Sequence, residues 1–460
     1  MTFFCLLFLL IFLSINVANS QWIIKNLPGF NGDLPFTLEI GYIGVGEQDE
    51  VQLFYYFIES EGSPKDDPLL LWLTGGPGCS AFSGLVYEVG PLKFNYLNSS
   101  GNRPTFELNP YSWTKVANMI FLDQPVGTGF SYATTSEAYN VTDTLAAAQI
   151  YVFLKKWFMV HTNFLTNTLY IAGDSYSGIV LPIVVQEISN GNEDGHYPPL
   201  NLKGYILGNP VTDLYNDLNS RVPFAYRKAL IPRPLYESIK TSCKGKYVYP
   251  DPRNTKCVRD MKVFGECTKD LDIAQILEPN CEYEVHPKPK ISSLIGFMDP
   301  HSSTYKPSKR WCRYDNYVLS YIWANDKTVQ KALHIREGTI EEWVRCNISL
   351  SYTENVFNSV DYHRNLSNKP YLALIYSGDH DMLIPYVGTN EWIQSLNLII
   401  EDGWRPWFVK GQVAGYTEIH RHDLYYLTFA TVKATGHTAP EYKPEQCLAM
   451  IDRWLSHYPL

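Results

Sequence analysis

One serine stands in a pattern that suits a nucleophile, within the stretch LYIAGDSYSG at residues 169–178. A short apolar run ends at a glycine, Ser175 lies between an acid and a tyrosine, and small residues precede a new apolar run. A serine hydroxyl becomes a good nucleophile only when a histidine takes its proton, and that histidine must be oriented by a carboxylate. Ser175 is therefore either the nucleophile of such a triad or an ordinary turn residue.

The chain supplies the two missing partners in a suitable order. Asp381 follows the apolar run LALIYSG, and His437 lies in KATGHTAPE after another apolar run. Nucleophile, acid and histidine follow one another in this order in α/β-hydrolases. The turn departs from a strict G-x-S-x-G pattern because Ser177 replaces the second glycine, but a small side chain still permits close helix–strand packing. We therefore predict a triad of Ser175, Asp381 and His437.

Short apolar runs that end at Gly, Pro or Asp recur along the chain and predict buried parallel strands. They occupy residues 68–76, 119–127, 169–174, 202–210 and 371–381. Helical patterns at 142–160 and 179–188 lie between some of them. This alternation predicts a doubly wound α/β sheet, with the candidate catalytic side chains at strand ends.

The alternation fails between residues 213 and 360, where Tyr, Pro, Lys and Cys are frequent. We interpret 213–360 as an insertion, or cap, that disulfides hold together. The strand pattern resumes at residue 371, and a helix predicted at 443–457 closes the chain. The predicted hydrolase core thus comprises residues 21–212 and 361–460.

The composition excludes several classes of partner. The chain has 460 residues, of which 45% are hydrophobic, and this is enough for a large core. Its net charge is −9 without a long run of like charges, so we expect neither nucleic acid nor an anionic membrane surface as a partner.

The first twenty residues resemble a secretory leader. The apolar block at 3–15 is shorter than the roughly 20 residues that a membrane-spanning helix needs. Ala18 and Ser20 occupy the small-residue positions of a cleavage site. We predict a signal peptide at residues 1–20, and no membrane association after its removal; an uncleaved anchor is the alternative.

Secretion changes how the cysteines are interpreted. An even number remains once Cys5 is removed, and an oxidising compartment favours disulfides over metal ligation. Because no pair has C-x-x-C spacing, we expect no metal site. Four glycosylation sequons agree with passage through the secretory pathway, at Asn98, Asn140, Asn347 and Asn365.

Longer motifs carry a resemblance to a known family. The stretches LLLWLTGGPGCSAFSGLVYEVGPL, FLDQPVGTGFSY, IAGDSYSG, SGDHDMLIP and ATGHTAPEYKPE, in this order, resemble the serine carboxypeptidase family over nearly all of the mature chain. The resemblance implies an α/β-hydrolase fold and the same triad, with the second aspartate of GDHD, Asp381, as the acid. It also implies an oxyanion hole formed by the backbone N–H groups of Gly76 and Tyr176.

The same resemblance implies a disulfide map and a destination. It pairs Cys79 with Cys346, Cys243 with Cys257, and Cys281 with Cys312, and leaves Cys267 and Cys447 unassigned. The polar, proline-rich segment at 284–310 is expected to be cleavable, which would give two chains joined by a disulfide. The vacuole is the family's usual destination, and the extracellular space is the alternative.

The substrate class depends on small departures from the peptidase pattern. In the peptidases an Asn in N-G-G-P-G binds the C-terminal carboxylate of the substrate together with glutamates. Here Thr74 takes that position, Asp174 replaces a glutamate in the elbow, and Glu88 is retained. These variants resemble the plant serine carboxypeptidase-like acyltransferases, which need no cofactor. The resemblance implies that the substrate-binding residues are Trp72, Thr74, Gly75, Glu88 and Asp174.

Three functions follow from this pattern. The favoured one is transfer of an acyl group from a 1-O-β-glucose ester to an alcohol or amine through a serine acyl-enzyme. The first alternative is a carboxypeptidase that releases C-terminal amino acids. The second is an inactive secreted binding protein, which the complete set of triad residues disfavours.

Overall fold

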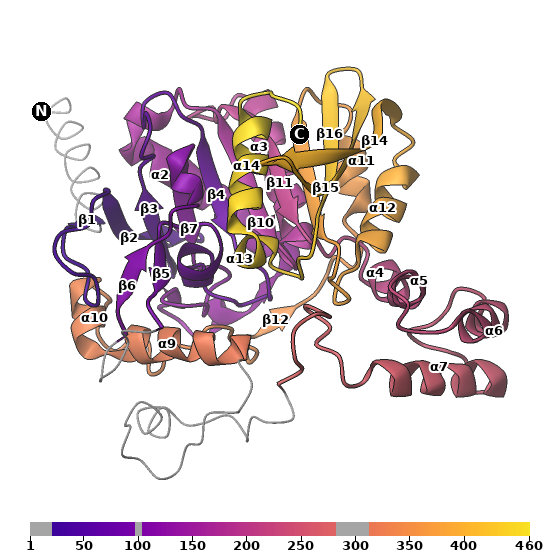
Figure 1. Ribbon diagram of the computed structural model, residues 1–460. Coiled ribbons are helices and arrows are strands. Elements are labelled where there is room, and N and C mark those ends of the chain that lie inside the picture. The colour runs from indigo at the N-terminus through magenta and orange to yellow at the C-terminus, as the bar shows by residue number, and fades with distance from the viewer. Residues whose placement is uncertain (1–20, 97–103, 282–311) are drawn as a thin grey trace, which may run out of the picture.

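Most strands join one mixed sheet in the structure, a computed structural model that describes residues 21–96, 104–281 and 312–460 (Figure 1). The strand order is β1-β2-β3-β7-β4-β10-β11-β13-β16-β15-β14, and β8 also pairs with β3. The pairs from β7 to β16 are parallel, whereas the pairs on either side are antiparallel. The bounds are β1 Gln21–Ile24, β2 Leu38–Val45, β3 Val51–Ile58, β4 Leu69–Leu73, β7 Asn118–Leu122, β8 Tyr132–Ala133, β10 Leu169–Asp174, β11 Leu202–Gly208, β13 Leu372–Gly378, β14 Ile399–Val409, β15 Gln412–His422 and β16 Tyr425–Val432.

The parallel strands form where the sequence predicts them. Each predicted run overlaps one strand, and the run at 169–174 matches β10 at both ends. All residues of β4 are buried, because both faces of the sheet are covered. Alternate residues of β4 face different cores: Leu69 and Leu71 face one, and Leu70 and Trp72 the other. The predicted doubly wound, mostly parallel sheet is confirmed.

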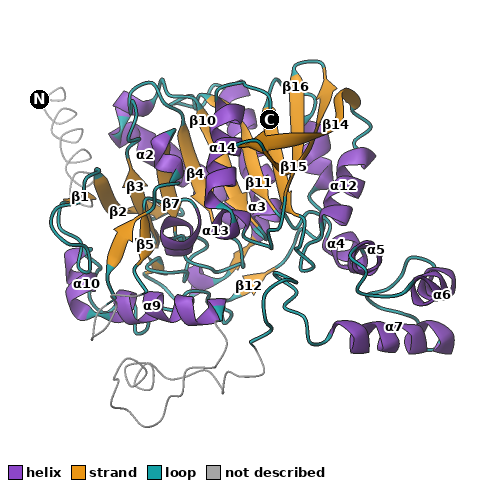
Figure 2. Ribbon diagram, viewed as in Figure 1, coloured by secondary structure: helices purple, strands orange, loops and turns teal. Residues whose placement is uncertain are grey.

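Helices pack on both faces of this sheet (Figure 2). The first core includes residues of α2 Asp143–Val160, α3 Ser177–Glu193, α11 Val360–Leu366 and α12 Tyr386–Ser395. The second includes residues of the π-helix Gly84–Glu88, α9 Arg313–Asn325, α10 Lys327–Ala332, α13 Ala439–Tyr442 and α14 Pro444–Leu455. Two small ribbons lie outside the main sheet, β5 Leu92–Phe94 with β6 Phe106–Leu108 and β9 Val141–Thr142 with β12 Tyr352–Thr353.

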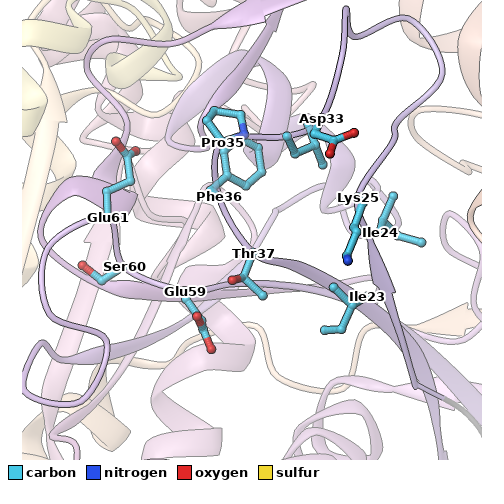
Figure 3. A pocket seen from close by; sticks show the side chains of 11 residues that line it. Ile23, Ile24, Lys25, Asp33, Pro35, Phe36, Thr37, Glu59, Ser60 and Glu61 are labelled. Carbon is cyan, nitrogen blue, oxygen red and sulfur yellow. The ribbon is translucent and has the colours of Figure 1, made fainter.

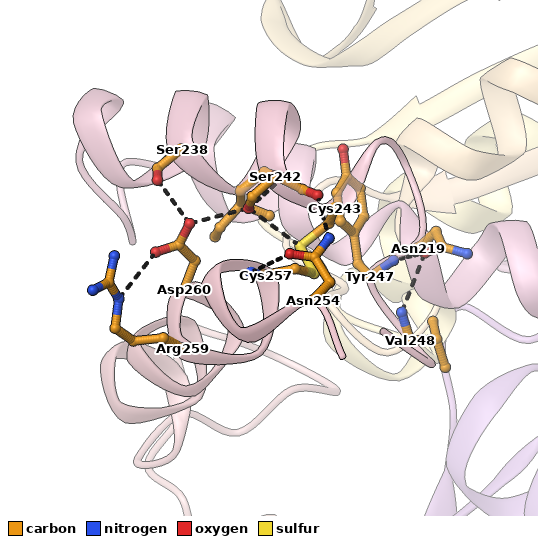
Figure 4. Close-up of a disulfide and its surroundings, with 11 residues drawn as sticks. Asn219, Ser238, Ser242, Cys243, Tyr247, Val248, Asn254, Cys257, Arg259 and Asp260 are labelled. Atoms are coloured by element: carbon orange, nitrogen blue, oxygen red, sulfur yellow. Dashed lines mark hydrogen bonds and ion pairs between the residues drawn. A yellow bond between two sulfur atoms is a disulfide. The ribbon is translucent and has the colours of Figure 1, made fainter. Parts of the chain in front are cut away.

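The stretch at 213–360 divides into two parts. The helices α4 Leu214–Asn219, α5 Arg221–Arg227, α6 Arg233–Cys243 and α7 Thr255–Thr268 come first, and α6 and α7 project from the body (Figure 1). Residues of α5, α6 and α7 share a small core with the Cys243–Cys257 disulfide. Beside this disulfide, Asp260 accepts hydrogen bonds from Ser238 and Ser242 (Figure 4). By contrast, α9 and α10 contribute to the second core of the sheet.

The structure contains the three disulfides that the resemblance implies, Cys79–Cys346, Cys243–Cys257 and Cys281–Cys312. Cys267 is exposed and Cys447 is buried, and neither forms a disulfide. Across the described ranges, no helix is long and apolar enough to cross a bilayer.

The glycosylation sequons differ in their surroundings. Asn140 and Asn365 are exposed. Asn347 is half-buried, and its side-chain amide donates a hydrogen bond to the carbonyl of Gly127 at 2.9 Å. The leader at 1–20, the sequon at Asn98 and the expected cleavage segment at 284–310 lie outside the described residues.

The packing of α9 allows a test of whether this helix, which lies within 213–360, belongs to the core of the sheet. The ring of Trp323 is 1% exposed and stacks on Phe82, with 4.7 Å between ring centroids. We expect Trp323→Ala to lower the free energy of unfolding by about 3–5 kcal/mol, because it leaves a cavity in the core of the sheet. Tyr249→Ala, at a side chain that is 78% exposed, is the matched control. Denaturant unfolding measures both, and a negligible loss for Trp323→Ala would show that α9 is dispensable to the core.

Candidate active site

Ser175 lies at the sharp turn between β10, which ends at Asp174, and α3, which begins at Ser177. Its φ of +54° is in the left-handed region, which costs a residue with a side chain about 1–2 kcal/mol. Backbone hydrogen bonds hold the turn: Ser175 N donates to Gly208 O and Val211 N donates to Ser175 O, both at 2.9 Å. The turn therefore places the hydroxyl at the carboxyl end of the parallel strands.

The three predicted triad residues meet in the structure. His437 Nε2 lies 2.7 Å from Ser175 Oγ, and His437 Nδ1 lies 2.8 Å from Asp381 Oδ2. An ionised carboxylate only accepts hydrogen bonds, so Nδ1 carries a proton and Nε2 is free to accept the serine proton. These distances are those that a nucleophile, its general base and an orienting acid require.

Asp381 is fully buried, and its carboxylate is held by several donors. Oδ1 accepts hydrogen bonds from Leu383 N at 2.7 Å and Ile384 N at 3.1 Å, and Oδ2 accepts one from Asn209 Nδ2 at 2.7 Å. Donors of this kind compensate for the loss of water around the charge. The carboxylate is thus fixed opposite His437.

Asn209 is a further residue of the site, beyond those predicted from the sequence. This residue follows β11, and its side-chain oxygen also accepts a hydrogen bond from Gly378 N at 3.2 Å. Asn209 therefore joins the end of β11 to the end of β13 and to the triad acid. A polar residue directly after the apolar run LKGYILG was an available signal, because β11 lies between β10 and β13.

The electrostatics favour His437 as a base. Burial opposes the charged imidazolium, but the charge and hydrogen bond of Asp381 and the charge of Asp174 outweigh it, so the pKa of His437 is raised above its ordinary value. A more basic imidazole accepts the serine proton more readily once it is itself deprotonated.

The glycine-rich turn after β4 approaches Ser175 closely. A side chain on Gly75 would place its first carbon 2.6 Å from Ser175 Cβ, so only glycine fits there. Gly75 N donates to Asp174 Oδ1 at 3.0 Å. Among the residues that the structure describes, the N–H groups of Gly76 and Tyr176 have no hydrogen-bond acceptor. Both predicted oxyanion donors are therefore free beside the serine.

The side chain of Tyr176 is anchored away from this turn. Its hydroxyl donates to Asp143 Oδ1 at 2.8 Å, and the hydroxyl of Tyr352 donates to the same oxygen at 2.7 Å. Asp143 is fully buried at the start of α2. The residue that supplies one predicted oxyanion donor is thus tied to α2 and to β12, a connection without a local sequence signal.

Trp72 and Thr74 are hydrogen-bonded to each other at the end of β4, just before the glycine-rich turn. The indole N–H of Trp72 donates to Thr74 Oγ1 at 3.1 Å. Trp72 is fully buried and packs edge-on against Trp113, with 5.5 Å between ring centroids. The expectation that Trp72 lines the substrate pocket stays a prediction; in the structure its indole has no exposed surface and contacts the turn through Thr74.

Two buried acids lie near the triad. Burial raises the pKa of Asp174 to about 6, although His437 and the N–H of Gly75 lower it. Burial, followed by the charge of Asp174, raises the pKa of Glu88 well above its ordinary value. Oε2 of Glu88 has no hydrogen-bond partner within the described chain. Both acids can therefore be neutral in mildly acidic solution, where they donate hydrogen bonds.

A separate cavity of about 720 Å³ lies far from these residues. It opens between β1, the approach to β2 and the end of β3, and Figure 3 shows Lys25, Asp33 and Glu59 around it. None of the predicted site residues lines it. Because β3 runs antiparallel to the central strands, its end lies at the edge of the sheet opposite Ser175.

Comparisons with known proteins match nearly the whole chain. The family model described as serine carboxypeptidase matches residues 28–457. Serine carboxypeptidase-like 1 of Arabidopsis thaliana is 50% identical over 98% of this chain and 96% of its own. Serine carboxypeptidase-like 17 of the same plant is 48% identical over 98% and 97%.

A solved structure has the same fold at lower identity. Kex1(delta)p, a prohormone-processing carboxypeptidase from Saccharomyces cerevisiae, superposes with a TM-score of 0.69 at 21% identity over 92% of this chain and 91% of its own. This likeness concerns the fold. Together with the family model and the plant relatives, it shows that the chain belongs to the serine carboxypeptidase family and has its α/β-hydrolase fold.

Proposed function

We propose that this protein transfers an acyl group from a 1-O-β-glucose ester to an alcohol or amine through an acyl-enzyme on Ser175. The observation that carries the proposal is the hydrogen bond of Thr74, in which its hydroxyl oxygen accepts the indole N–H of Trp72. The resemblance places a carboxylate-binding asparagine amide at this position in the peptidases. Thr74 has one hydroxyl proton in place of the two amide protons, which weakens a site for a peptide carboxylate.

The triad geometry supports the first half of the reaction. His437 Nε2 takes the proton of Ser175 Oγ as the oxygen attacks the ester carbonyl, and the N–H groups of Gly76 and Tyr176 would stabilise the oxyanion. The bond to the glucose oxygen then breaks, and His437 returns its proton to that oxygen. The products of this half are free glucose and an acyl-enzyme.

The second half uses the same residues in reverse. The acceptor hydroxyl or amine gives its proton to His437 as it attacks the acyl carbonyl, and Ser175 recovers its proton when the tetrahedral species collapses. Transfer competes with water only when the acceptor is held in attack geometry, which can supply effective molarities of about 10⁵–10⁸ M. No step requires a metal or a cofactor.

The buried acids suit a neutral sugar ligand. Below a pH of about 6 Asp174 is largely protonated, and a neutral carboxyl both donates to and accepts from hydroxyl groups. In this proposal Thr74, Gly75, Glu88 and Asp174 bind the donor. Oε2 of Glu88 has no hydrogen-bond partner within the described chain, and in this proposal a hydroxyl group of the donor supplies one.

A carboxypeptidase is the second candidate, and the retained Glu88 favours it. An unpartnered buried carboxyl can donate to the C-terminal carboxylate of a peptide as well as to a sugar. The inactive binding protein has less support, since Ser175, His437 and Asp381 lie at hydrogen-bonding distances.

The secretory route remains part of the proposal. The three disulfides suit an oxidising compartment, and the exposed Asn140 and Asn365 are accessible to glycosylation. We propose the vacuole or the extracellular space as the destination, and a mature protein without its leader. Cleavage within 284–310 would leave two chains that the Cys281–Cys312 disulfide joins.

The triad is tested by separate substitutions. Ser175→Ala, Asp381→Ala and His437→Ala should each reduce kcat by at least about 10³-fold, because the three groups act as one unit. Product formation from a glucose ester, measured by mass spectrometry, reports the loss, and circular dichroism checks the fold. Substantial transfer by Ser175→Ala would rule out the acyl-enzyme.

The pH dependence of inhibition tests the acid pair. Asp174 changes from neutral to ionised as the pH rises through about 6, and an ionised acid repels a carboxylate. A blocked dipeptide with a free C-terminus should therefore inhibit acyl transfer from a glucose ester about tenfold more weakly at pH 7.5 than at pH 5. Asp174→Asn should remove most of this change, while the KM for a neutral glucose ester varies little. An equal change in wild type and variant would contradict the role of Asp174.

A double substitution separates the two candidate functions. The unmodified protein should transfer acyl groups from a glucose ester faster than it hydrolyses a blocked dipeptide. Thr74→Asn with Asp174→Glu should shift this ratio toward peptide hydrolysis, through hydrogen bonds to the carboxylate worth about 1.5–3 kcal/mol each. The shift will be partial, since other residues shape the acceptor site. Efficient release of C-terminal amino acids by the unmodified protein, with no transfer from any glucose ester, would leave the carboxypeptidase.

A further inference from the structure

Residues 271–281, here called the crossing segment, lie against the loops that carry Asp381 and His437. The segment follows α7 and ends at the Cys281–Cys312 disulfide. Its backbone bonds to both catalytic loops: Ile273 O accepts Met382 N at 2.9 Å, Ala274 O accepts His437 N at 2.7 Å, and Ile276 N donates to His380 O at 3.2 Å. The main chain of the catalytic histidine is thus held by a segment from outside the sheet.

The crossing segment has a fixed shape. An antiparallel bridge between Leu271 and Pro279 closes it into a loop, and Asp272 Oδ1 accepts Ala274 N at 2.9 Å. It also lies close to the histidine loop, because a side chain on Gly436 would come within 2.1 Å of Ala274 O. Displacement of the loop would therefore move the acceptor of His437 N as well.

Arg313 ties this loop to the helix that follows His437. Its Nε donates to Glu278 Oε2 of the crossing segment at 2.9 Å, and its Nη1 donates to Glu441 Oε1 of α13 at 3.0 Å. The guanidinium also lies over the ring of Tyr442, 4.2 Å from the centroid. The side chains of Arg313, Glu278 and Glu441 are only 18%, 18% and 7% exposed, so solvent screens these charges weakly.

We propose that Arg313 is a positioning residue, which holds the crossing segment against α13 and thereby keeps His437 aligned with Asp381 and Ser175. This inference rests on the proposed function only in taking Ser175 as the nucleophile. Arg313 bridges two weakly exposed carboxylates. Glu441 Oε2 also accepts hydrogen bonds from the hydroxyls of Tyr317 and Thr438, whereas Arg313 joins Glu441 to the crossing segment. Without the guanidinium, like charges would separate Glu278 from Glu441 and loosen the backbone bond from His437 N to Ala274 O.

The disulfide does not replace this bridge. Cys281–Cys312 fixes the end of the crossing segment, while the contacts with the catalytic loops are made by residues 273–276. Glu278 lies between these two points, so the ion pair acts closer to the residues that hold His437. Arg313, directly after Cys312, is therefore expected to matter even with the disulfide intact.

The test measures how fast a fluorophosphonate labels Ser175, because this reaction needs the activated serine but no natural substrate. We expect Arg313→Met to slow labelling at least tenfold while the KM for a glucose ester changes less than threefold. Arg313→Lys should recover part of the rate, since one ammonium cannot bridge both carboxylates as the fork of a guanidinium does. Arg253→Met, which removes a 91% exposed arginine between the projecting helices α6 and α7, should leave the rate unchanged.

The pH profile of labelling separates alignment from a general loss of stability. Contact with Asp381 contributes to the raised pKa of His437, so Arg313→Met should move the apparent pKa of the labelling rate downward. A normal labelling rate with a raised KM would overturn the proposal and make Arg313 a substrate ligand. An unchanged rate and pKa would overturn it as well.

One further variant, Glu278→Gln, and labelling of the wild type keep the outcomes distinct. If Arg313→Met does not fold, Glu278→Gln and Arg313→Lys serve in its place, because both retain hydrogen-bonding groups; unchanged labelling in both would refute the positioning role. Absence of labelling in the wild type would instead refute the proposed nucleophile. Labelling of the wild type without any transfer or hydrolysis would leave the alignment role intact and refute only the proposed reaction.

Discussion

The left-handed backbone of Ser175 is the constraint on which the site depends. This conformation costs about 1–2 kcal/mol and persists only where the surrounding structure enforces it. Hydrogen bonds to Gly208 and Val211 enforce it from β11 and the loop after it. Ser177 contributes from the other side, since its hydroxyl donates to Leu73 O of β4 at 2.6 Å. The serine that departs from the strict glycine pattern therefore secures the elbow.

The sequence predicts those parts of the site that follow from local pattern. Apolar runs that end at polar residues identify the parallel strands, and their common direction brings Ser175, Asp381 and His437 to one edge of the sheet. Asn209 directly follows the apolar run of β11, so the same pattern also points to it. The buried position of Trp72 was harder to foresee, because it depends on which face of β4 the indole takes and on its packing against Trp113.

The remaining features have no local signal at all. The flanking antiparallel strands and the division of 213–360 depend on which distant apolar surfaces meet. Trp323 lies within the cysteine-rich stretch, yet it stacks on Phe82 in the core of the sheet. The bond between Ala274 and His437 joins two backbone groups, which carry no side-chain signature. Contacts of this kind follow from the whole fold and could not be derived from periodicity or spacing.

The buried acids Asp174 and Glu88 form one electrostatic system with His437. The charge of Asp174 raises the pKa of His437, and the charge of His437 lowers the pKa of Asp174, so the two titrations are linked. Glu88 extends this system, because the charge of Asp174 also raises its pKa. A ligand that alters the protonation of either acid therefore also changes the basicity of His437. Binding of a ligand beside Asp174 and the basicity of His437 are thus physically coupled.

The stretch at 213–360 contacts the candidate site through its backbone. The chain leaves the sheet after β11, builds the projecting α6 and α7, and returns through the crossing segment before α9 packs on the second core. Cys79–Cys346 ties the glycine-rich turn to the chain after α10, and Cys281–Cys312 ties the crossing segment to α9. Cys243–Cys257 joins only α6 to α7. Two of these disulfides therefore tie down segments that lie against Ser175 or His437, so the stretch at 213–360 supports the geometry of the candidate site and also packs on the sheet.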